Sequence, residues 1–464
     1  MADDAPLFDP ALLEDALDRS SRYLAGLGER RVAPDADQTA AASVALGGAL
    51  PELGTDPAEV LRLLDEYGSP STVASAGPRY FGFVTGGVLP AALATNWLAA
   101  AWDQNAFSRV SSPIGSILEG IAEEWLVALL GLPAGTAASF VSGATMANVT
   151  GLVSARTALL AELDWSVEEQ GMFGAPPIQV VVGGEVHASM RKALAFSGFG
   201  RERVVRVPVD DQGRMRADML PTLKAPAIVC LQAGNVNTGA FDPAHEIIPA
   251  LSGPGVWFHV DGAFGLWAAA APERAHLVAG YEDADSWAVD GHKWLNVPYD
   301  SGIALVRDRT AVVRANTIRA TYLPDDPADR DPYDYTPEAS RRPRGMEIWA
   351  ALRSLGQSGL EDLVERCCRH AARFAAGLEA AGYEVLNEVC LNQVLVSFGT
   401  PQRTLTVIEG VQREGTCWAG GTEWQGRTAM RISVSGWSTT TEDVDRSLEA
   451  ILRIASVTPL AEED

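Results

Sequence analysis

The stretch Ser286-Trp287-Ala288-Val289-Asp290-Gly291-His292-Lys293-Trp294 is the most informative part of the chain. Its first five residues alternate as a buried β-strand does, and the strand ends by presenting Lys293. A lysine amine can form an imine with an aldehyde cofactor, and a partly desolvated amine is a good nucleophile. A solvated surface lysine is the ordinary alternative, because lysines are mostly exposed. The neighbouring motifs decide between these two interpretations.

A second motif, His259-Val260-Asp261-Gly262-Ala263, closes an apolar run and delivers a carboxylate at the end of another predicted strand. The spacing between Asp261 and Lys293 suits one helix or loop excursion and a return strand of an α/β sheet, so both side chains can reach one crevice. An aspartate there could pair with the protonated pyridine nitrogen of pyridoxal phosphate. The structural alternative is an aspartate that caps the next helix.

Two further segments could complete a cofactor site. The segment Phe140-Val141-Ser142-Gly143-Ala144-Thr145-Met146-Ala147-Asn148 places small residues before a predicted helix, whose amino terminus would favour a phosphate dianion. An ordinary helix cap gives the same pattern. His187 follows the β-rich residues 178–182 and could stack on the pyridine ring and carry a proton. A histidine held by local hydrogen bonds is the alternative.

In the order phosphate loop, His187, Asp261, Lys293, these elements resemble the group II pyridoxal-phosphate-dependent amino acid decarboxylases, which include aromatic amino acid and glutamate decarboxylases. The resemblance runs from about residue 79 to about residue 436. It implies pyridoxal 5'-phosphate as the cofactor. It also implies the type I fold of pyridoxal-phosphate-dependent transferases: an α/β fold with a mostly parallel central sheet, an amino-terminal helical segment and a smaller carboxyl-terminal α+β domain.

The resemblance assigns roles residue by residue. Lys293 is implied to be the imine lysine, Asp261 the partner of the pyridine nitrogen and His187 the stacking histidine. The remaining implied cofactor contacts are Gly143, Ala144, Thr145, Asn235, Ala263 and His292. Asn235 stands where many relatives have threonine, and Met146 stands where many have glutamate.

The family also has a mobile loop that reaches into the partner subunit's site and carries a tyrosine that protonates the reacting carbon. Residues 319–344 are predicted to be this lid, because their prolines and acids indicate an irregular, exposed segment. Tyr335 is the predicted proton donor and Tyr333 the alternative, while a tyrosine that anchors a surface loop is the structural interpretation. We expect Tyr335→Phe to lower the amine yield and raise the aldehyde yield, and an unchanged ratio would move the role to Tyr333.

The substrate pocket is predicted from residues 79–85 and 102–109, which resemble the pocket wall of the family. Phe83 and Phe107 would give an aromatic lining, which favours a ring-bearing side chain. The second segment also holds polar side chains, which favour an acidic substrate: Gln104, Asn105 and Arg109. A substrate carboxylate needs a cation, and the candidates are Arg341, Arg342 and Arg431.

The predicted function is therefore decarboxylation of an L-amino acid, with an aromatic substrate favoured, to the amine and CO2. Glutamate- or aspartate-type decarboxylation, oxidative decarboxylation to an aldehyde, and carbon-carbon lyase chemistry are the alternatives. A binding or regulatory protein that keeps the fold is disfavoured, because Lys293 is present. The resemblance also predicts a homodimer with shared active sites.

Composition limits the other possibilities. The 464 residues exceed one ordinary core, and the formal net charge of −24 argues against nucleic acid or an anionic membrane surface as a partner. No apolar run approaches the roughly 18 residues of a spanning helix, and the acidic start lacks a secretory signal, so the cytoplasm is predicted. Five cysteines without C-x-x-C spacing predict neither a disulfide framework nor a metal site.

The chain is predicted to divide into residues 1–89, amino-terminal helices that pack on the partner subunit; 90–318, the large cofactor-binding domain; 319–344, the lid; and 345–464, the small domain. The predicted strands are residues 178–182, 204–209, 228–231, 256–260, 286–289, 302–306, 393–398 and 430–434. The predicted helices are residues 10–27, 57–67, 345–356, 359–382 and 441–454, the last opened by the capping pattern Thr441-Glu442-Asp443-Val444.

Overall fold

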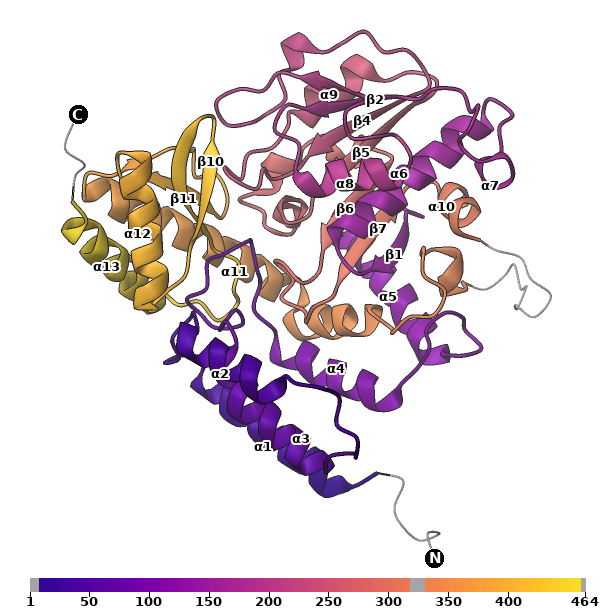
Figure 1. Cartoon of the computed structure of the whole chain (residues 1–464). Helices are drawn as coiled ribbons and strands as arrows, with labels where there is room; N and C mark the ends of the chain where they lie inside the picture. The colour runs from indigo at the N-terminus through magenta and orange to yellow at the C-terminus, as the bar shows by residue number, and fades with distance from the viewer. Residues whose placement is uncertain (1–7, 318–329, 460–464) are drawn as a thin grey trace, which may run out of the picture.

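The computed structural model of the chain describes residues 8–317 and 330–459. Figure 1 shows a layer of amino-terminal helices, a large α/β domain around a twisted sheet and a smaller domain formed by the end of the chain. The α/β fold with a smaller carboxyl-terminal α+β domain is confirmed.

Seven strands form the central sheet, in the order β1-β7-β6-β5-β4-β2-β3. The strands are β1 (Ala137–Val141), β2 (Gln179–Gly183), β3 (Val204–Val207), β4 (Ala227–Gln232), β5 (Val256–Asp261), β6 (Ser286–Asp290) and β7 (Gly302–Val306). The pairs β2-β3, β2-β4, β4-β5 and β5-β6 are parallel, whereas β7 is antiparallel to both β1 and β6. The six strands predicted in this domain are confirmed within two residues, and β1 was not predicted.

The sheet is buried on both faces. In β2, Val180 and Val182 pack into one core cluster and Val181 into another, as the alternation of side chains along a strand requires. Helix α6 (Ala144–Ala161) contacts β1, β5, β6 and β7 and is buried along most of its length. The sheet edge formed by Val141, Asp290 and the start of β7 at Gly302 therefore meets the amino terminus of α6.

Further helices surround this sheet. They are α5 (Pro113–Leu129), α7 (Val167–Gln170), α8 (Ala188–Phe196), α9 (Ala244–Leu251) and α10 (Arg309–Asn316). Short 3-10 turns lie at Ser69–Ser71, Ala217–Met219, Gly265–Ala270, Ala275–Val278, Tyr281–Asp283 and Pro332–Asp334, and a π turn lies at Leu64–Gly68.

The small domain contains a four-stranded antiparallel sheet in the order β10-β11-β9-β8. Its elements are α11 (Gly345–Ala380), β8 (Glu384–Val385), β9 (Gln393–Ser397), α12 (Pro401–Glu414), β10 (Gly420–Trp424), β11 (Arg427–Ser433) and α13 (Thr441–Val457). The two helices predicted on either side of Gly356 form one element with a break at that residue, whose φ of 61° suits glycine. The cap of α13 is Thr440 rather than the predicted Thr441, because its hydroxyl accepts the Asp443 N–H.

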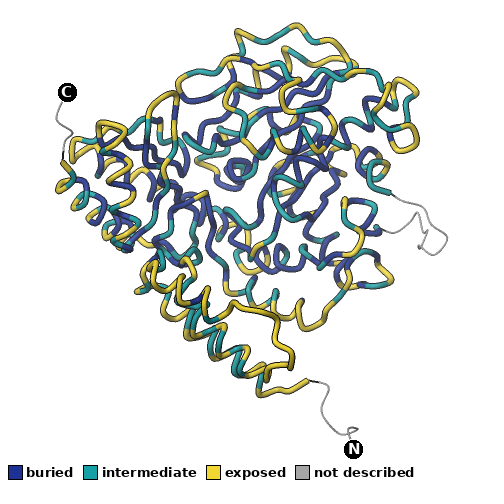
Figure 2. The backbone as a smooth tube through the Cα atoms, in the orientation of Figure 1, coloured by how far each residue is buried: buried dark blue, intermediate teal, exposed yellow. Residues whose placement is uncertain are grey.

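The amino-terminal helices are α1 (Pro10–Gly26), α2 (Ala36–Leu46), α3 (Pro57–Leu63) and α4 (Pro90–Trp102). Asp9 caps α1 and a proline opens it, which accounts for the predicted start. Helices α1 and α3 contain no buried residue, and Figure 2 shows this layer as mostly exposed. Within residues 8–317 and 330–459, no helix combines the length and the apolar character needed to cross a bilayer.

Residues 319–329 of the predicted lid lie outside the described residues. Residues 330–344 differ from the prediction of an exposed segment. Residues 330–344 are irregular, as predicted, but they are not an exposed segment. Tyr333 and Tyr335 are each 6 % exposed, and Asp331 accepts the Arg109 N–H at 2.7 Å. The prolines and acids predicted irregular backbone correctly, but they could not predict that this segment docks on the large domain.

Candidate active site

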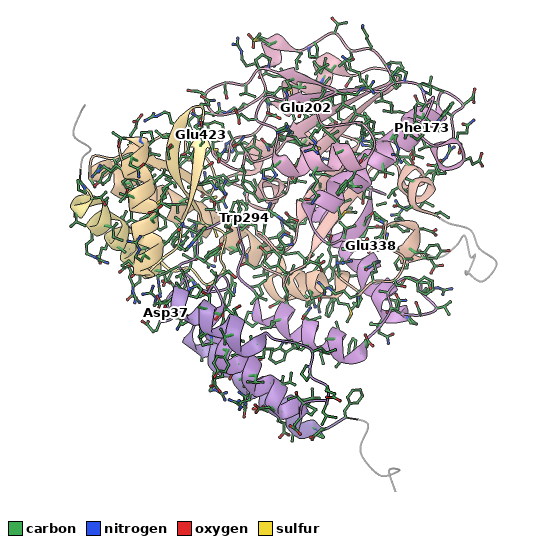
Figure 3. All side chains as sticks on the ribbon, viewed as in Figure 1. Asp37, Phe173, Glu202, Trp294, Glu338 and Glu423 are labelled. Carbon is green, nitrogen blue, oxygen red and sulfur yellow. The ribbon has the colours of Figure 1, made fainter. Side chains whose placement is uncertain are left out.

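Lys293 lies three residues beyond β6, in a turn at the carboxyl edge of the central sheet. Its Nζ is 3.1 Å from Oδ2 of Asp290, the last residue of β6, and 5.9 Å from the centre of the Phe264 ring. The neighbouring Trp294 is fully buried near the middle of the molecule, as Figure 3 shows. Lys293 is thus a mostly buried, ion-paired lysine rather than a solvated surface one.

Asp290 connects three of the predicted site elements. Its Oδ1 accepts the Ala144 N–H at 2.5 Å and lies 3.4 Å from His292 Nε2, while its Oδ2 faces Lys293. Asp290 is 2 % exposed. Sequence reasoning assigned it no role beyond the strand end, because its helix contact is 146 residues away and leaves no local signal.

Glycines allow the backbone segments to meet at this edge. A Cβ on Gly302 would lie 2.4 Å from the Gly143 Cα, and a Cβ on Gly143 would lie 3.1 Å from the His292 ring. The first turn of α6 then presents backbone N–H groups that lack an intrahelical acceptor. An 18-residue helix with small residues at its start suits a phosphate dianion, so this edge fits the predicted phosphate group. Thr145 is half-buried in the same turn.

Asp261 ends β5 and lies one strand away from Asp290 in the sheet. Its Oδ1 accepts the Ala263 N–H at 3.3 Å, a bond within the turn after β5, and it does not cap the next helical turn, whose cap position is Phe264. Its Oδ2 accepts a hydrogen bond from Asn148 Nδ2 of α6 at 3.2 Å. Ala263 is half-buried, and its carbonyl accepts the Asp290 N–H at 2.9 Å. The two acidic strand ends are therefore tied together through the backbone.

His187 caps helix α8 and lies within electrostatic reach of Asp261 and Lys293. Its Nδ1 accepts the Ser189 N–H at 3.2 Å, which leaves Nε2 to carry the proton of the neutral ring. Burial lowers the pKa of His187, and the charges of Asp261, Lys293 and Arg431 act on it electrostatically. The local hydrogen bonds and the proximity to the site are both present, so the two interpretations of His187 are compatible.

Asn235 is buried, but its side chain is used locally. Its Oδ1 accepts the Asn237 N–H at 2.8 Å and the Thr238 N–H at 3.3 Å, and its Nδ2 donates to Gln232 Oε1 at 3.1 Å. These contacts shape the turn after β4. The structure does not bring the Asn235 side chain into contact with Lys293, Asp261 or His187.

Arg341, which was predicted to bind the substrate carboxylate, is paired with a buried glutamate. Arg341 forms a bidentate pair with Glu119 at 2.6 and 2.8 Å, and its side chain is 1 % exposed. The structure therefore does not bring Arg341 to Lys293. Arg342 pairs with Asp300 and Glu347, so it also has carboxylate partners.

Arg431 of β11 is the candidate that remains near the site. Its positive charge contributes to lowering the pKa of His187, and its Nη1 donates to Asn237 Oδ1 at 3.3 Å. Burial alone lowers its pKa. Among the residues that the structure describes, no carboxylate oxygen lies within 4.0 Å of its guanidinium. A buried cation with only an amide partner is suited to receive a carboxylate.

Tyr335, Tyr333 and Phe107 lie apart from Lys293 within the subunit. The Tyr335 hydroxyl accepts a hydrogen bond from Arg309 at 2.9 Å, beyond the end of β7, and the Arg330 guanidinium lies 4.0 Å from the Tyr335 ring. This is the edge of the sheet opposite Asp290 and Gly302. Tyr333 packs on Phe107 with ring centres 6.0 Å apart. Their predicted roles stay predictions that require a second subunit.

Aromatic rings form one pair at the site and a second group that joins residues 80–83 to the small domain. Tyr299 stacks on His292 with ring centres 4.4 Å apart. Tyr80 stacks on Trp418 at 5.1 Å, and Phe83 leans on Trp418 at 5.4 Å. Phe83 is 63 % exposed and has a φ of 54°, a conformation that side chains rarely adopt. Sequence reasoning found Phe83 but missed Tyr299 and Trp418, which follow from tertiary packing.

Comparison with known proteins places this geometry in a family. The Pyridoxal-dependent decarboxylase conserved domain matches residues 68–400. The aromatic-L-amino-acid decarboxylase of Bacillus atrophaeus is 25 % identical, with 89 % of this chain and 87 % of that protein covered. The L-2,4-diaminobutyrate decarboxylase of Rhizobium meliloti (strain 1021) is 27 % identical, with 89 % and 88 % covered. The crystal structure of Oryza sativa TDC with PLP and tryptamine aligns with a TM-score of 0.86 at 21 % identity, covering 97 % of this chain and 99 % of that one.

The fold and the lysine-centred site define a pyridoxal-phosphate-dependent lyase. The chain belongs to the pyridoxal-dependent decarboxylase family, and pyridoxal phosphate is its cofactor. The type I fold predicted for it is confirmed. Its relatives act on amino acids of different classes, so membership alone leaves the side chain of the substrate open.

Proposed function

We propose that this enzyme decarboxylates an L-amino acid with an aromatic side chain and releases the amine and CO2. The observation that carries the proposal is the pair of aromatic groups, Tyr299 on His292 and the rings of residues 80 and 83 on Trp418. Aromatic side chains gain about 0.5–1.5 kcal/mol from ring-ring contacts beyond the burial of their area, so such a wall favours a planar ring over a short polar side chain.

In this proposal, each residue of the site has a defined task. Lys293 Nζ holds the cofactor covalently, and Asp290 orients that amine. Asp261 meets the pyridine nitrogen, which favours its protonated form, and His187 covers the ring. The start of α6 binds the phosphate. When bound, pyridoxal phosphate supplies an electron sink for the carbon that loses CO2.

Arg431 is our proposed partner for a carboxylate of the substrate. If it binds the carboxylate that leaves, the contact must be modest, because tight ground-state binding would slow the loss of CO2. If it binds a side-chain carboxylate instead, the substrate is acidic. Its lack of a carboxylate partner among the described residues is the observation that favours this second candidate function.

We further propose that the enzyme works as a homodimer. The amino-terminal layer exposes large apolar side chains: Leu13, Leu17, Trp97, Leu98 and Trp102. An apolar surface of this kind on a soluble chain is usually covered by a partner, and a second copy would also bring residues 330–344 to another site. Sedimentation of the wild-type protein and of Leu98→Lys tests this proposal. We expect a dimer that dissociates in the variant, and a monomeric wild-type protein would contradict it.

A substrate panel tests the aromatic preference. The purified enzyme, supplied with pyridoxal phosphate, is incubated with tryptophan, tyrosine, phenylalanine, glutamate, aspartate and 2,4-diaminobutyrate, and the amines, CO2 and oxygen uptake are measured. We expect the highest kcat/KM with an aromatic amino acid and no oxygen uptake. Trp418→Ala should reduce this preference, because it removes the ring on which Tyr80 and Phe83 pack. A preference for glutamate or aspartate would support the acidic alternative, and oxygen uptake would indicate aldehyde formation.

A further inference from the structure

A continuous chain of buried side chains leads to Asp261 from behind the cofactor site. Trp257 Nε1 donates to Ser286 Oγ at 2.8 Å, and Ser286 Oγ lies 2.8 Å from His259 Nδ1. His259 Nε2 lies 2.9 Å from Asn148 Oδ1, and Asn148 Nδ2 donates to Asp261 Oδ2 at 3.2 Å. Ser286, His259 and Asn148 are completely buried, so water cannot replace any of these bonds.

The two ends of this chain fix the direction of every bond. The Trp257 indole can only donate a hydrogen bond, and an ionised carboxylate at Asp261 can only accept one. The Asn148 amide nitrogen must therefore face Asp261, which turns its oxygen to His259 Nε2. That nitrogen must then carry the proton, and His259 Nδ1 accepts from the Ser286 hydroxyl. Each of the four bonds then has one donor and one acceptor.

The surroundings of His259 are built for a neutral ring. Burial lowers the pKa of His259 to about 3. Gly151, one turn after Asn148 on α6, makes room for the ring, because a Cβ there would lie 2.6 Å from His259 Cε1. A helix with alanine at this position would collide with the histidine. The chain is thus part of how α6 packs on β5 and β6.

We infer that Asn148 and His259 are positioning residues that hold the Asp261 carboxylate toward the pyridine nitrogen of the cofactor. A carboxylate on a strand end can rotate, and an oriented donor on one oxygen limits that rotation and leaves the other oxygen to the turn and the cofactor. A buried polar chain of this kind is costly unless every member is paired, and here every member is paired. The inference rests on the proposed role of Asp261.

A cofactor analogue separates positioning from general stability. In 1-deaza-pyridoxal phosphate a carbon replaces the pyridine nitrogen, while the aldehyde and the phosphate are kept. We expect the wild-type apoenzyme to bind pyridoxal phosphate more tightly than this analogue by about tenfold or more, because a hydrogen bond to a charged group is lost. In Asn148→Leu, which keeps the volume and removes the amide, this preference should fall by about tenfold while affinity for the analogue stays within about threefold.

Ser154→Ala is the matched control. Ser154 is also fully buried on α6 and donates to the Thr150 carbonyl at 2.8 Å, but it lies outside the chain. Its preference for pyridoxal phosphate should equal that of the wild-type protein. If Asn148→Leu weakened both ligands equally and kept the ratio, Asn148 would have only a structural role and the inference would be wrong.

The wild-type protein supplies a second measurement if Asn148→Leu does not fold. The ring-nitrogen NMR shifts of His259 in the apoenzyme should report a neutral ring protonated on Nε2 at pH 7. A charged ring, or a proton on Nδ1, would overturn the inference. Two failures are distinguishable: a wild-type enzyme that binds both cofactor forms equally contradicts only the role of Asp261, whereas one that forms no covalent complex with pyridoxal phosphate contradicts the proposed function.

Discussion

The carboxyl edge of the central sheet and residues 330–344 form two contrasting regions. At the sheet edge, Lys293, His292 and Asp290 come from one strand end and already contact each other in a single subunit. In residues 330–344, the charged and aromatic side chains contact their own large domain, and Tyr335 and Arg341 bond to Arg309 and Glu119 rather than to Lys293. A site residue defined by its strand end can be located from sequence, whereas a residue that acts across subunits cannot be placed without the assembly.

The largest effect is expected on stability, when the buried arginine of residues 330–344 is removed. Replacing Arg341 leaves Glu119 buried without its partner, so Arg341→Ala should lower the free energy of unfolding by about 3–5 kcal/mol. Urea unfolding measures this. Arg373→Ala is the matched control, because Arg373 makes a similar bidentate pair with Asp445 at the surface, where solvent screens the charges, and its loss should change the stability little. If Arg341→Ala kept normal stability and weakened substrate binding, Arg341 would bind the substrate, as predicted from the sequence.

Arg431→Met tests whether the arginine near His187 binds the substrate. Because a hydrogen-bonded charge contributes about 1.5–3 kcal/mol, kcat/KM should fall by about tenfold to a hundredfold. The stability should change little, since only a 3.3 Å bond to Asn237 is lost. An unchanged kcat/KM would show that Arg431 does not meet the substrate.

A smaller effect is expected in the pH dependence of stability, because His259 is buried in the sheet. The pKa of His259 is lowered by burial to about 3, whereas the unfolded chain protonates it near pH 6.5. The unfolded state therefore binds more protons between these values, and stability falls as pH drops below about 6.5, by about 1.4 kcal/mol per pH unit. Comparing His259→Gln with the wild-type protein between pH 7.5 and pH 5 isolates this contribution. Parallel stability curves would contradict the buried, neutral histidine.

The smallest effect is expected at Tyr335. Its contacts with Arg309 and Arg330 suggest a structural role in its own subunit, so Tyr335→Phe should cost about 1 kcal/mol and leave the ratio of amine to aldehyde unchanged. Tyr333→Phe and Tyr322→Phe complete the set, because these are the other tyrosines of the predicted lid. Tyr322 lies outside the described residues. A rise in aldehyde with Tyr335→Phe would restore its predicted role as proton donor from the partner.

Sequence patterns predicted the elements whose signal is local. The alternating strand before Lys293 and the apolar run before Asp261 each end one residue later than predicted, and both side chains reach one edge because the strands are parallel neighbours. The Asp290 contact with Ala144 and the ring stack between Tyr80 and Trp418 could not be predicted, since these partners meet only in the folded chain. The prolines and acids of the predicted lid indicated irregular backbone, but composition does not specify where residues 330–344 dock.

Covalent trapping shows whether Lys293 is the lysine that carries the cofactor. The chain has only three lysines, so Lys192 and Lys224, both exposed, are internal controls. The enzyme is incubated with pyridoxal phosphate, reduced with borohydride, digested and analysed by mass spectrometry. We expect one stoichiometric adduct on Lys293, which is lost in Lys293→Ala and kept in Lys192→Arg. A stoichiometric adduct on another lysine, or none on Lys293, would contradict it.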